Sequence, residues 1–122
     1  MHEGAIVQSI FDSAIEIKEK ENLETISTIK IIVGEYHQIV KEVMFTYFDI
    51  MKKDYDGFGN SKLDMKIVPI KVKCHSCNHT FKINDPILIC PNCQSFETEI
   101  LSGKELYIET ISGETNNIKK RS

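Results

Sequence analysis

Four cysteines in two closely spaced pairs constrain this chain more than any other feature. Cys74 and Cys77 form a C-H-S-C pair, Cys90 and Cys93 form a C-P-N-C pair, and the sequence contains no other cysteine. Zn²⁺ prefers four soft donors in a tetrahedron, and two such pairs on a short loop can supply four thiolates without a large fold around them. A site closed by four thiolates leaves no position for water, so the predicted zinc is structural.

The size and charge of the chain limit the remaining possibilities. With 122 residues, of which 41% are hydrophobic, the chain suits one small domain that carries a smaller metal module. The formal net charge of -3 disfavours a general nucleic-acid binder, which usually has an excess of basic residues. No apolar run is long enough to span a membrane, and no signal peptide is visible. We therefore expect a cytoplasmic protein whose cysteines bind metal and do not form disulfides.

Hydrophobic periodicity predicts two helices separated by a strand. Residues 5–21 carry an apolar stripe at helical spacing, and β-branched residues fill 25–33 before Gly34. Helical spacing returns over 39–53, with an apolar stripe that we interpret as core. A partner groove or a methionine-rich metal site are the alternatives for that stripe. Its members are Val40, Val43, Met44, Tyr47, Phe48 and Met51.

The second half of the chain predicts strands around the zinc module. Apolar and polar residues alternate over 63–73, and the phase of the alternation changes at Pro69, where a proline fits a sheet edge or a bulge. A last strand is predicted over 104–111, after a turn at Ser102-Gly103. The predicted fold class is therefore α/β (α+β), with two helices on a small three-stranded sheet and an inserted four-cysteine zinc-ribbon module.

The amino terminus offers a second metal site. The Met1 amine, the His2 amide nitrogen and the His2 imidazole can reach one metal ion through small chelate rings, and the Glu3 amide nitrogen lies one ring further on. Together they form a planar set of nitrogen donors, which Ni(II) and Cu(II) accept and tetrahedral Zn(II) does not favour. The residues alone leave a second interpretation open, in which His2 is an ordinary histidine in a frayed terminus.

Several motifs occur together at the two ends of the chain. Met1-His2-Glu3 opens an amphipathic helix, and a strand ends at Gly34. The cysteine pairs read C-x-x-C and C-P-x-C-x-S, and Ile100 to Leu106 follow the pattern I-x-x-G-K-E-L. In this combination the chain resembles the HypA/HybF family of hydrogenase nickel-incorporation proteins, from Met1 to about Ile111.

The resemblance implies a nickel metallochaperone with two domains. A nickel-binding α/β domain would comprise residues 1–73 and 97–112, and a zinc-binding domain would comprise residues 74–96 with the four cysteines as ligands. Residues 113–122 are polar and are expected to form a flexible tail.

The resemblance also implies the cargo, its ligands and the partners. Ni(II) would be transferred cargo, bound by His2 with the Met1 amine and the Glu3 backbone, and Zn(II) would be structural. The family works with a GTPase, HypB, and delivers nickel to the large subunit of NiFe hydrogenase. In some organisms it also supplies urease, for which the partner would be a urease accessory protein. We expect no nucleic-acid or membrane partner, and a monomer or weak homodimer.

Other interpretations of these residues lead to different functions. A redox role would need one Cys-x-x-Cys pair at a helix start, so two pairs beside β-rich sequence fit zinc better. We expect His75, His79 and His37 to be loop residues, although the first two could also make the zinc site sensitive to pH.

No nucleophile–base pair or phosphate loop indicates an enzyme. The alternative function is a zinc-ribbon module that binds protein or nucleic acid through Lys62, Lys66, Lys71 and Lys73.

Overall fold

The computed structural model describes residues 2–83 and 88–115 and divides the chain into two packed units. The first unit contains Met1–Ile31, Ile39–Met65 and Ile108–Ser122, and the second contains Ile32–Gln38 and Lys66–Tyr107. The domains expected from the sequence, 1–73 with 97–112 and 74–96, were defined by the expected metal ligands and not by packing. They stay a prediction. Within the described ranges, no helix is both long and apolar enough to cross a membrane.

Helix α1 (Glu3–Lys20) supplies much of the core of the first unit. Its apolar residues recur every three or four positions, so the helix turns them all to one face. The acidic Glu3 in its first turn and the basic Lys18 and Lys20 in its last turn complement the helix dipole. The helix predicted over 5–21 is therefore confirmed, and it begins two residues earlier. The buried residues of this face are Ile6, Val7, Ile10, Phe11 and Ala14.

Helix α2 (Lys41–Met51) continues into a short 3-10 helix, η2 (Lys52–Asp54), and packs against α1. Met44 and Phe48 are fully buried, and the ring of Phe48 stacks on Phe11 with 5.0 Å between the ring centroids. The interpretation of the whole apolar stripe as core was wrong. The apolar arc of α2 is wider than the surface that covers it, so Met51 is only half-buried, and three other members of the stripe are exposed, as is Ile50: Val40, Val43 and Tyr47.

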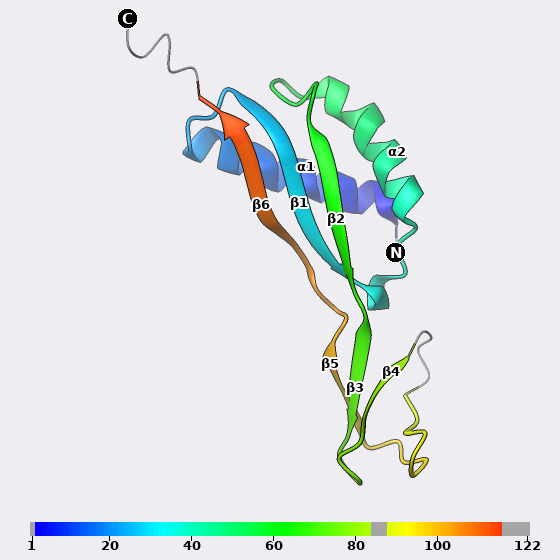
Figure 1. Cartoon of the computed structure of the whole chain (residues 1–122). Coiled ribbons are helices and arrows are strands. Elements are labelled where there is room, and N and C mark those ends of the chain that lie inside the picture. Colours follow the sequence, from blue (N-terminus) through cyan, green and yellow to red (C-terminus); the bar gives the residue numbers. More distant parts are fainter. Residues whose placement is uncertain (1, 84–87, 116–122) are drawn as a thin grey trace, which may run out of the picture. The chain divides into compact units, whose positions relative to one another are not determined.

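The first sheet contains three strands in the order β2-β1-β6. The central strand is β1 (Thr25–Gly34), with β2 (Lys62–Val68) and β6 (Leu106–Glu114) on its two sides. The β-branched sequence of β1 suits this central position, where a strand has neighbours on both edges. Figure 1 shows α1 crossing one face of this sheet. Strand β6 extends past residue 113, where the tail was predicted to begin, and residues 116–122 of that tail lie outside the described residues.

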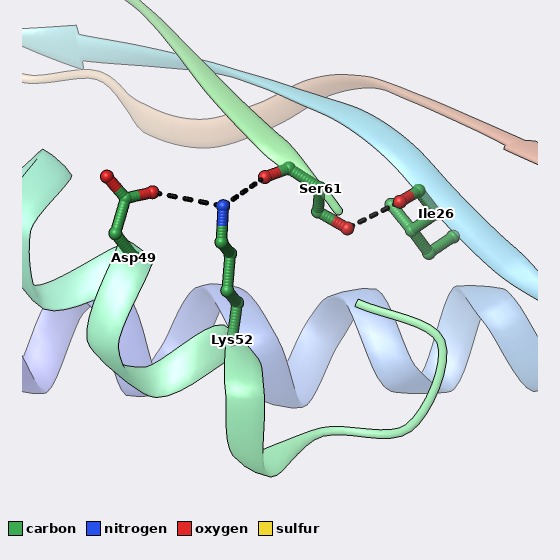
Figure 2. Close-up of polar contacts among 4 residues, drawn as sticks. All are labelled: Ile26, Asp49, Lys52 and Ser61. Carbon is green, nitrogen blue, oxygen red and sulfur yellow. Dashed lines mark hydrogen bonds and ion pairs between the residues drawn. The ribbon is translucent and has the colours of Figure 1, made fainter. Parts of the chain in front are cut away.

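A buried polar contact joins the end of α2 to the first sheet. The Ser61 hydroxyl, which is fully buried, donates to the carbonyl oxygen of Ile26 in β1. Lys52 Nζ donates to the carbonyl oxygen of Ser61 at 3.0 Å and lies 3.3 Å from Asp49 Oδ1, as Figure 2 shows. Each buried polar atom of Ser61 therefore has a partner, which fixes the loop between α2 and β2.

The second unit contains a separate three-stranded sheet in the order β4-β3-β5. Strand β3 (Ile70–Cys74) pairs antiparallel with both β4 (Thr80–Ile83) and β5 (Thr98–Ser102). The strand predicted over 63–73 is therefore two strands, β2 and β3, in different sheets. They part at Pro69, which has no N–H to donate to a ladder, and the change of phase in the sequence marks that point.

Two chain segments approach each other closely at Gly34 and Gly103, next to the second sheet. A Cβ atom on Gly34 would lie 1.9 Å from the carbonyl oxygen of Gly103, and Gly103 itself has φ +107°. Only glycine fits both positions. The 3-10 helix η1 (Glu35–His37) follows, and the Glu35 carboxylate accepts the N–H of Ile70 at 2.8 Å. These contacts anchor the first residues of β3.

Candidate metal centre

The two cysteine pairs fold into turns with the same hydrogen bonds. In the first turn, the N–H of Asn78 donates to the carbonyl oxygen of Cys74 at 2.9 Å. In the second, the N–H of Gln94 donates to the carbonyl oxygen of Cys90 at 2.7 Å. Asn78 and Gln94 also share a left-handed backbone, with φ of +63° and +60°. The residue after the second cysteine of each pair thus turns the chain so that both thiols of the pair face the same side.

The four thiols converge on one point. Sγ of Cys74 lies 3.5 Å from Sγ of Cys93, and Sγ of Cys77 lies 3.6 Å from Sγ of Cys90. All four sulfur atoms lie within 4.8 Å of one another, and all four cysteines are free. A disulfide would need about 2.05 Å between sulfurs. A tetrahedral zinc ion with Zn–S bonds of about 2.3 Å places its sulfurs about 3.8 Å apart, so the cluster fits Zn(II).

Hydrogen bonds favour the thiolate form of two of these cysteines, Cys77 and Cys74. Asn92 Nδ2 donates to Cys77 Sγ at 3.4 Å, and this bond, with the N–H of His79, lowers the pKa of Cys77 to about 6. Burial raises the pKa of Cys74, but the N–H groups of Cys77 and Ser76 outweigh it and lower the pKa overall. A site that already stabilises negative sulfur suits a divalent cation.

Cys93 has the opposite tendency. The N–H of Ser95 acts to lower the pKa of Cys93. Burial and the three neighbouring sulfurs together outweigh this effect and raise the pKa to about 12. Four sulfurs this close cannot all be negative without a cation, so one of them retains a proton. Metal binding must therefore displace that proton, and the affinity of the site for metal must depend on pH.

The side chains of the three histidines predicted to be loop residues do not belong to the sulfur cluster. His75 is exposed, and its Nε2 lies 2.9 Å from Glu99 Oε1. His79 is also exposed and stacks on the ring of Phe81. His37 Nε2 donates to the carbonyl oxygen of Lys104 at 2.9 Å. Among the described residues, the group of potential ligands is formed by the four cysteines alone.

The amino terminus presents the second predicted metal site. Met1 lies outside the described residues, whereas His2 is exposed and precedes the first residue of α1. The His2 side chain makes no capping bond to the helix, and the first helical bond runs from the N–H of Ile6 to the carbonyl oxygen of His2 at 3.2 Å. The amides before Ile6 therefore have no carbonyl partner within the helix.

Glu3 differs from His2 because its carboxylate accepts a hydrogen bond from a residue far away in the sequence. The N–H of Val40, which precedes α2, donates to Glu3 Oε2 at 3.0 Å, and this bond lowers the pKa of the carboxyl group. The sequence gives no signal of this contact, since the two residues are 37 positions apart. A further contact lies beside it, because a Cβ atom on Gly4 would lie 3.3 Å from the Tyr47 ring. The first turn of α1 is thus held against α2.

Comparison with known proteins places the whole arrangement in one family. Residues 1–113 match the family described as hydrogenase/urease nickel incorporation, metallochaperone, HypA. The chain belongs to the HypA family. The resemblance inferred from the amino terminus and the cysteine pairs is therefore confirmed, and so is the α+β fold class with its four-cysteine module.

Individual HypA relatives match over almost their full length. The hydrogenase maturation factor HypA of Dehalococcoides mccartyi strain 195 is 32% identical over 111 residues, which cover 91% of this chain and 92% of that protein. The same factor from Caldanaerobacter subterraneus is 32% identical over 115 residues, covering 93% and 100%. The solution structure of the Ni metallochaperone HypA from Helicobacter pylori has the same fold, with a TM-score of 0.68 at 22% identity and coverage of 95% and 100%.

Proposed function

We propose that this HypA protein binds Ni(II) at its amino terminus and delivers it for the maturation of NiFe hydrogenase. The observation that carries the proposal is the match of residues 1–113 to a nickel-incorporation family, in a chain whose exposed His2 precedes a helix. The ligands would be the Met1 amine, the His2 imidazole and the amide nitrogens of His2 and Glu3.

The start of α1 supports this set of ligands on energetic grounds. A planar nitrogen site requires two amides to lose their protons, which in a helix interior would break backbone hydrogen bonds. The amides of His2 and Glu3 precede the first helical bond, made by Ile6, so no such bond is lost. The Glu3 carboxylate contributes indirectly, because its contact with Val40 holds the first turn in place.

Zinc would have a separate, structural role. We propose that Zn(II) is held by Cys74, Cys77, Cys90 and Cys93, where it supplies a closed cross-link and no catalytic position. Such sites contribute roughly 10–16 kcal/mol of binding free energy to local folding. Since the second unit has a small sheet and few buried side chains, this contribution would decide whether the ribbon is ordered.

The partners and clients follow from the family. We propose that the GTPase HypB acts with this protein, that the large subunit of NiFe hydrogenase receives the nickel, and that urease is a second client. A metallochaperone transfers its metal without chemical change, so we assign no catalytic residue. The free thiols of the zinc site fit a reducing compartment, and we therefore place the protein in the cytoplasm.

Nickel titration of untagged protein tests the proposal. The samples are the native protein, a form extended at the amino terminus, the His2→Ala variant, and His37→Gln as a control histidine outside the site. The native and His37→Gln samples should bind one Ni(II) per chain with a weak yellow band of low-spin Ni(II). The extended and His2→Ala samples should lose that band while zinc content stays constant. Equal nickel affinity in all four samples would rule out nickel binding at the amino terminus. It would favour the alternative function, a zinc-ribbon module that binds protein or nucleic acid.

A further inference from the structure

The solvent side of the second sheet carries three lysines close together. Lys71 and Lys73 lie two positions apart on the central strand β3, and Lys82 lies on β4. The antiparallel register places Lys71 directly opposite Lys82, and Lys73 directly opposite Thr80. Side chains two positions apart on a strand, or directly opposite each other on paired strands, point to the same face of a sheet. We call Lys71, Lys73 and Lys82 the lysine face.

The other face of the same strand is apolar and belongs to the core of the second unit. Ile70, Val72 and Cys74 are buried, and they alternate with the two lysines of β3. Lys71 and Lys82 are exposed, and Lys73 is half-buried. The alternation of β3 therefore holds the lysines on the side of the sheet that a partner can reach.

The lysine face has no acidic partner within the described parts of the chain. None of its three lysines takes part in an ion pair there. Glu99 lies directly opposite Lys73 in the register with β5, but its Oε1 lies 2.9 Å from Nε2 of His75 instead. Three ammonium groups beside one carboxylate give this face a local excess of positive charge, on a chain whose formal net charge is -3.

The pairing of Lys71 with Lys82 is unfavourable for the protein by itself, because like charges directly opposite each other destabilise a sheet. A lysine on an edge strand is common, since it discourages unwanted strand pairing, and this reason covers Lys82 on β4. It does not cover Lys71 and Lys73, which lie on the central strand. An anionic group placed over the face would relieve the repulsion between the opposed lysines.

The number and spacing of the charges favour an acidic peptide segment over nucleic acid. Binding through phosphates strengthens with each contact, and three lysines on an acidic chain fall short of the roughly 6–10 contacts of a typical DNA-binding protein. Lys71 and Lys73 are separated by about 6.8 Å along the strand, which is also the same-side repeat of an extended peptide. We therefore propose that the lysine face is a docking surface for an acidic, extended segment of a partner protein, with carboxylates at alternate positions.

NMR titration of the untagged, zinc-loaded and nickel-free protein tests this surface separately from nickel binding. The probe is a short peptide that alternates glutamate and serine, and the control peptide has glutamine in place of each glutamate. The glutamate peptide should shift the amide signals of β3 and β4, with a dissociation constant on the order of 10⁻³ M that rises as salt is added. The glutamine peptide should leave those signals unchanged.

Substitutions locate the contact. Lys71→Gln and Lys82→Gln should each weaken peptide binding about two- to fivefold, since each removes one exposed ion pair. Lys62→Gln is the matched control in β2 of the first unit and should bind as the wild type does. Lys82→Gln should also slow hydrogen exchange of the β3 amides by up to about fivefold, because it removes one of two opposed charges. Weaker binding by a more stable sheet is a combination that a purely structural role of the lysine would not give.

Each possible result decides the question. Far-UV circular dichroism and zinc content confirm that every variant is folded. An absence of shifts in β3 and β4, or binding that Lys71→Gln and Lys82→Gln leave unchanged, overturns the proposal. A single-stranded DNA oligonucleotide is the competing ligand, and larger shifts at the lysine face with DNA than with the peptide would overturn the choice of a protein segment. Faster exchange in Lys82→Gln would show that the opposed lysines do not repel each other, and it would remove the reason for a ligand.

Discussion

Phe11 is the centre of an aromatic cluster, and replacing it with alanine should remove a large part of the stability of the first unit. Its side chain is fully buried. Its ring stacks on Phe48 and on Tyr55, with centroid distances of 5.0 and 4.5 Å, and meets Phe58 edge-on at 5.5 Å. A buried Phe→Ala change costs about 3–5 kcal/mol, and each aromatic pair adds about 0.5–1.5 kcal/mol beyond its buried area. We expect a loss of about 4–5 kcal/mol.

Urea denaturation followed by circular dichroism at 222 nm measures this loss. Both α-helices belong to the first unit, so the helical signal reports on that unit even where the zinc ribbon unfolds separately. Phe96→Ala is the matched control, since the Phe96 side chain is 78% exposed and its removal should change stability by less than about 0.5 kcal/mol. A loss below about 1 kcal/mol for Phe11→Ala would show that the aromatic cluster does not support the first unit.

Two further predictions concern the cysteine cluster. Cys90→Ala should lose the zinc and disorder the ribbon while the 222 nm signal is kept; metal analysis and hydrogen exchange check this, and a global loss of helix would contradict it. Zinc affinity should fall as the pH is lowered, and more steeply below about 6, because Cys77, whose pKa is depressed to about 6, then takes up a proton that competes with the metal. Competition with a chromophoric chelator between pH 5 and 8 measures the slope, and a constant affinity across that range would refute the role of the thiolates.

The local patterns of the sequence determined both α-helices, strand β1 and the four-cysteine cluster. Helix α1 follows from its 3.6-residue periodicity, and β1 follows from its β-branched residues. Each Cys-x-x-Cys pair is visible in the sequence because its turn is closed by a hydrogen bond between residues only four positions apart. The change of phase at Pro69 was also visible, since a proline interrupts a strand through its own chemistry.

Other features were decided only by tertiary structure. The sequence predicts that α2 is apolar along a wide arc, but only packing determines that Met44 and Phe48 are covered while Val43 and Tyr47 are exposed. The two strands on either side of Pro69 join different sheets, which depends on strand partners far away in the chain.

The same distinction applies to the amino terminus. The donor atoms proposed for nickel at His2 were inferred from its position in the sequence, because chelation uses neighbouring residues. The contact between Glu3 and the N–H of Val40 joins positions that only the packing of two helices brings together. Periodicity and chelation are properties of neighbouring residues, and a sequence states them directly. Which surfaces are covered, and which distant groups meet, depends on the competition of all segments for one core, and only the folded structure resolves that competition.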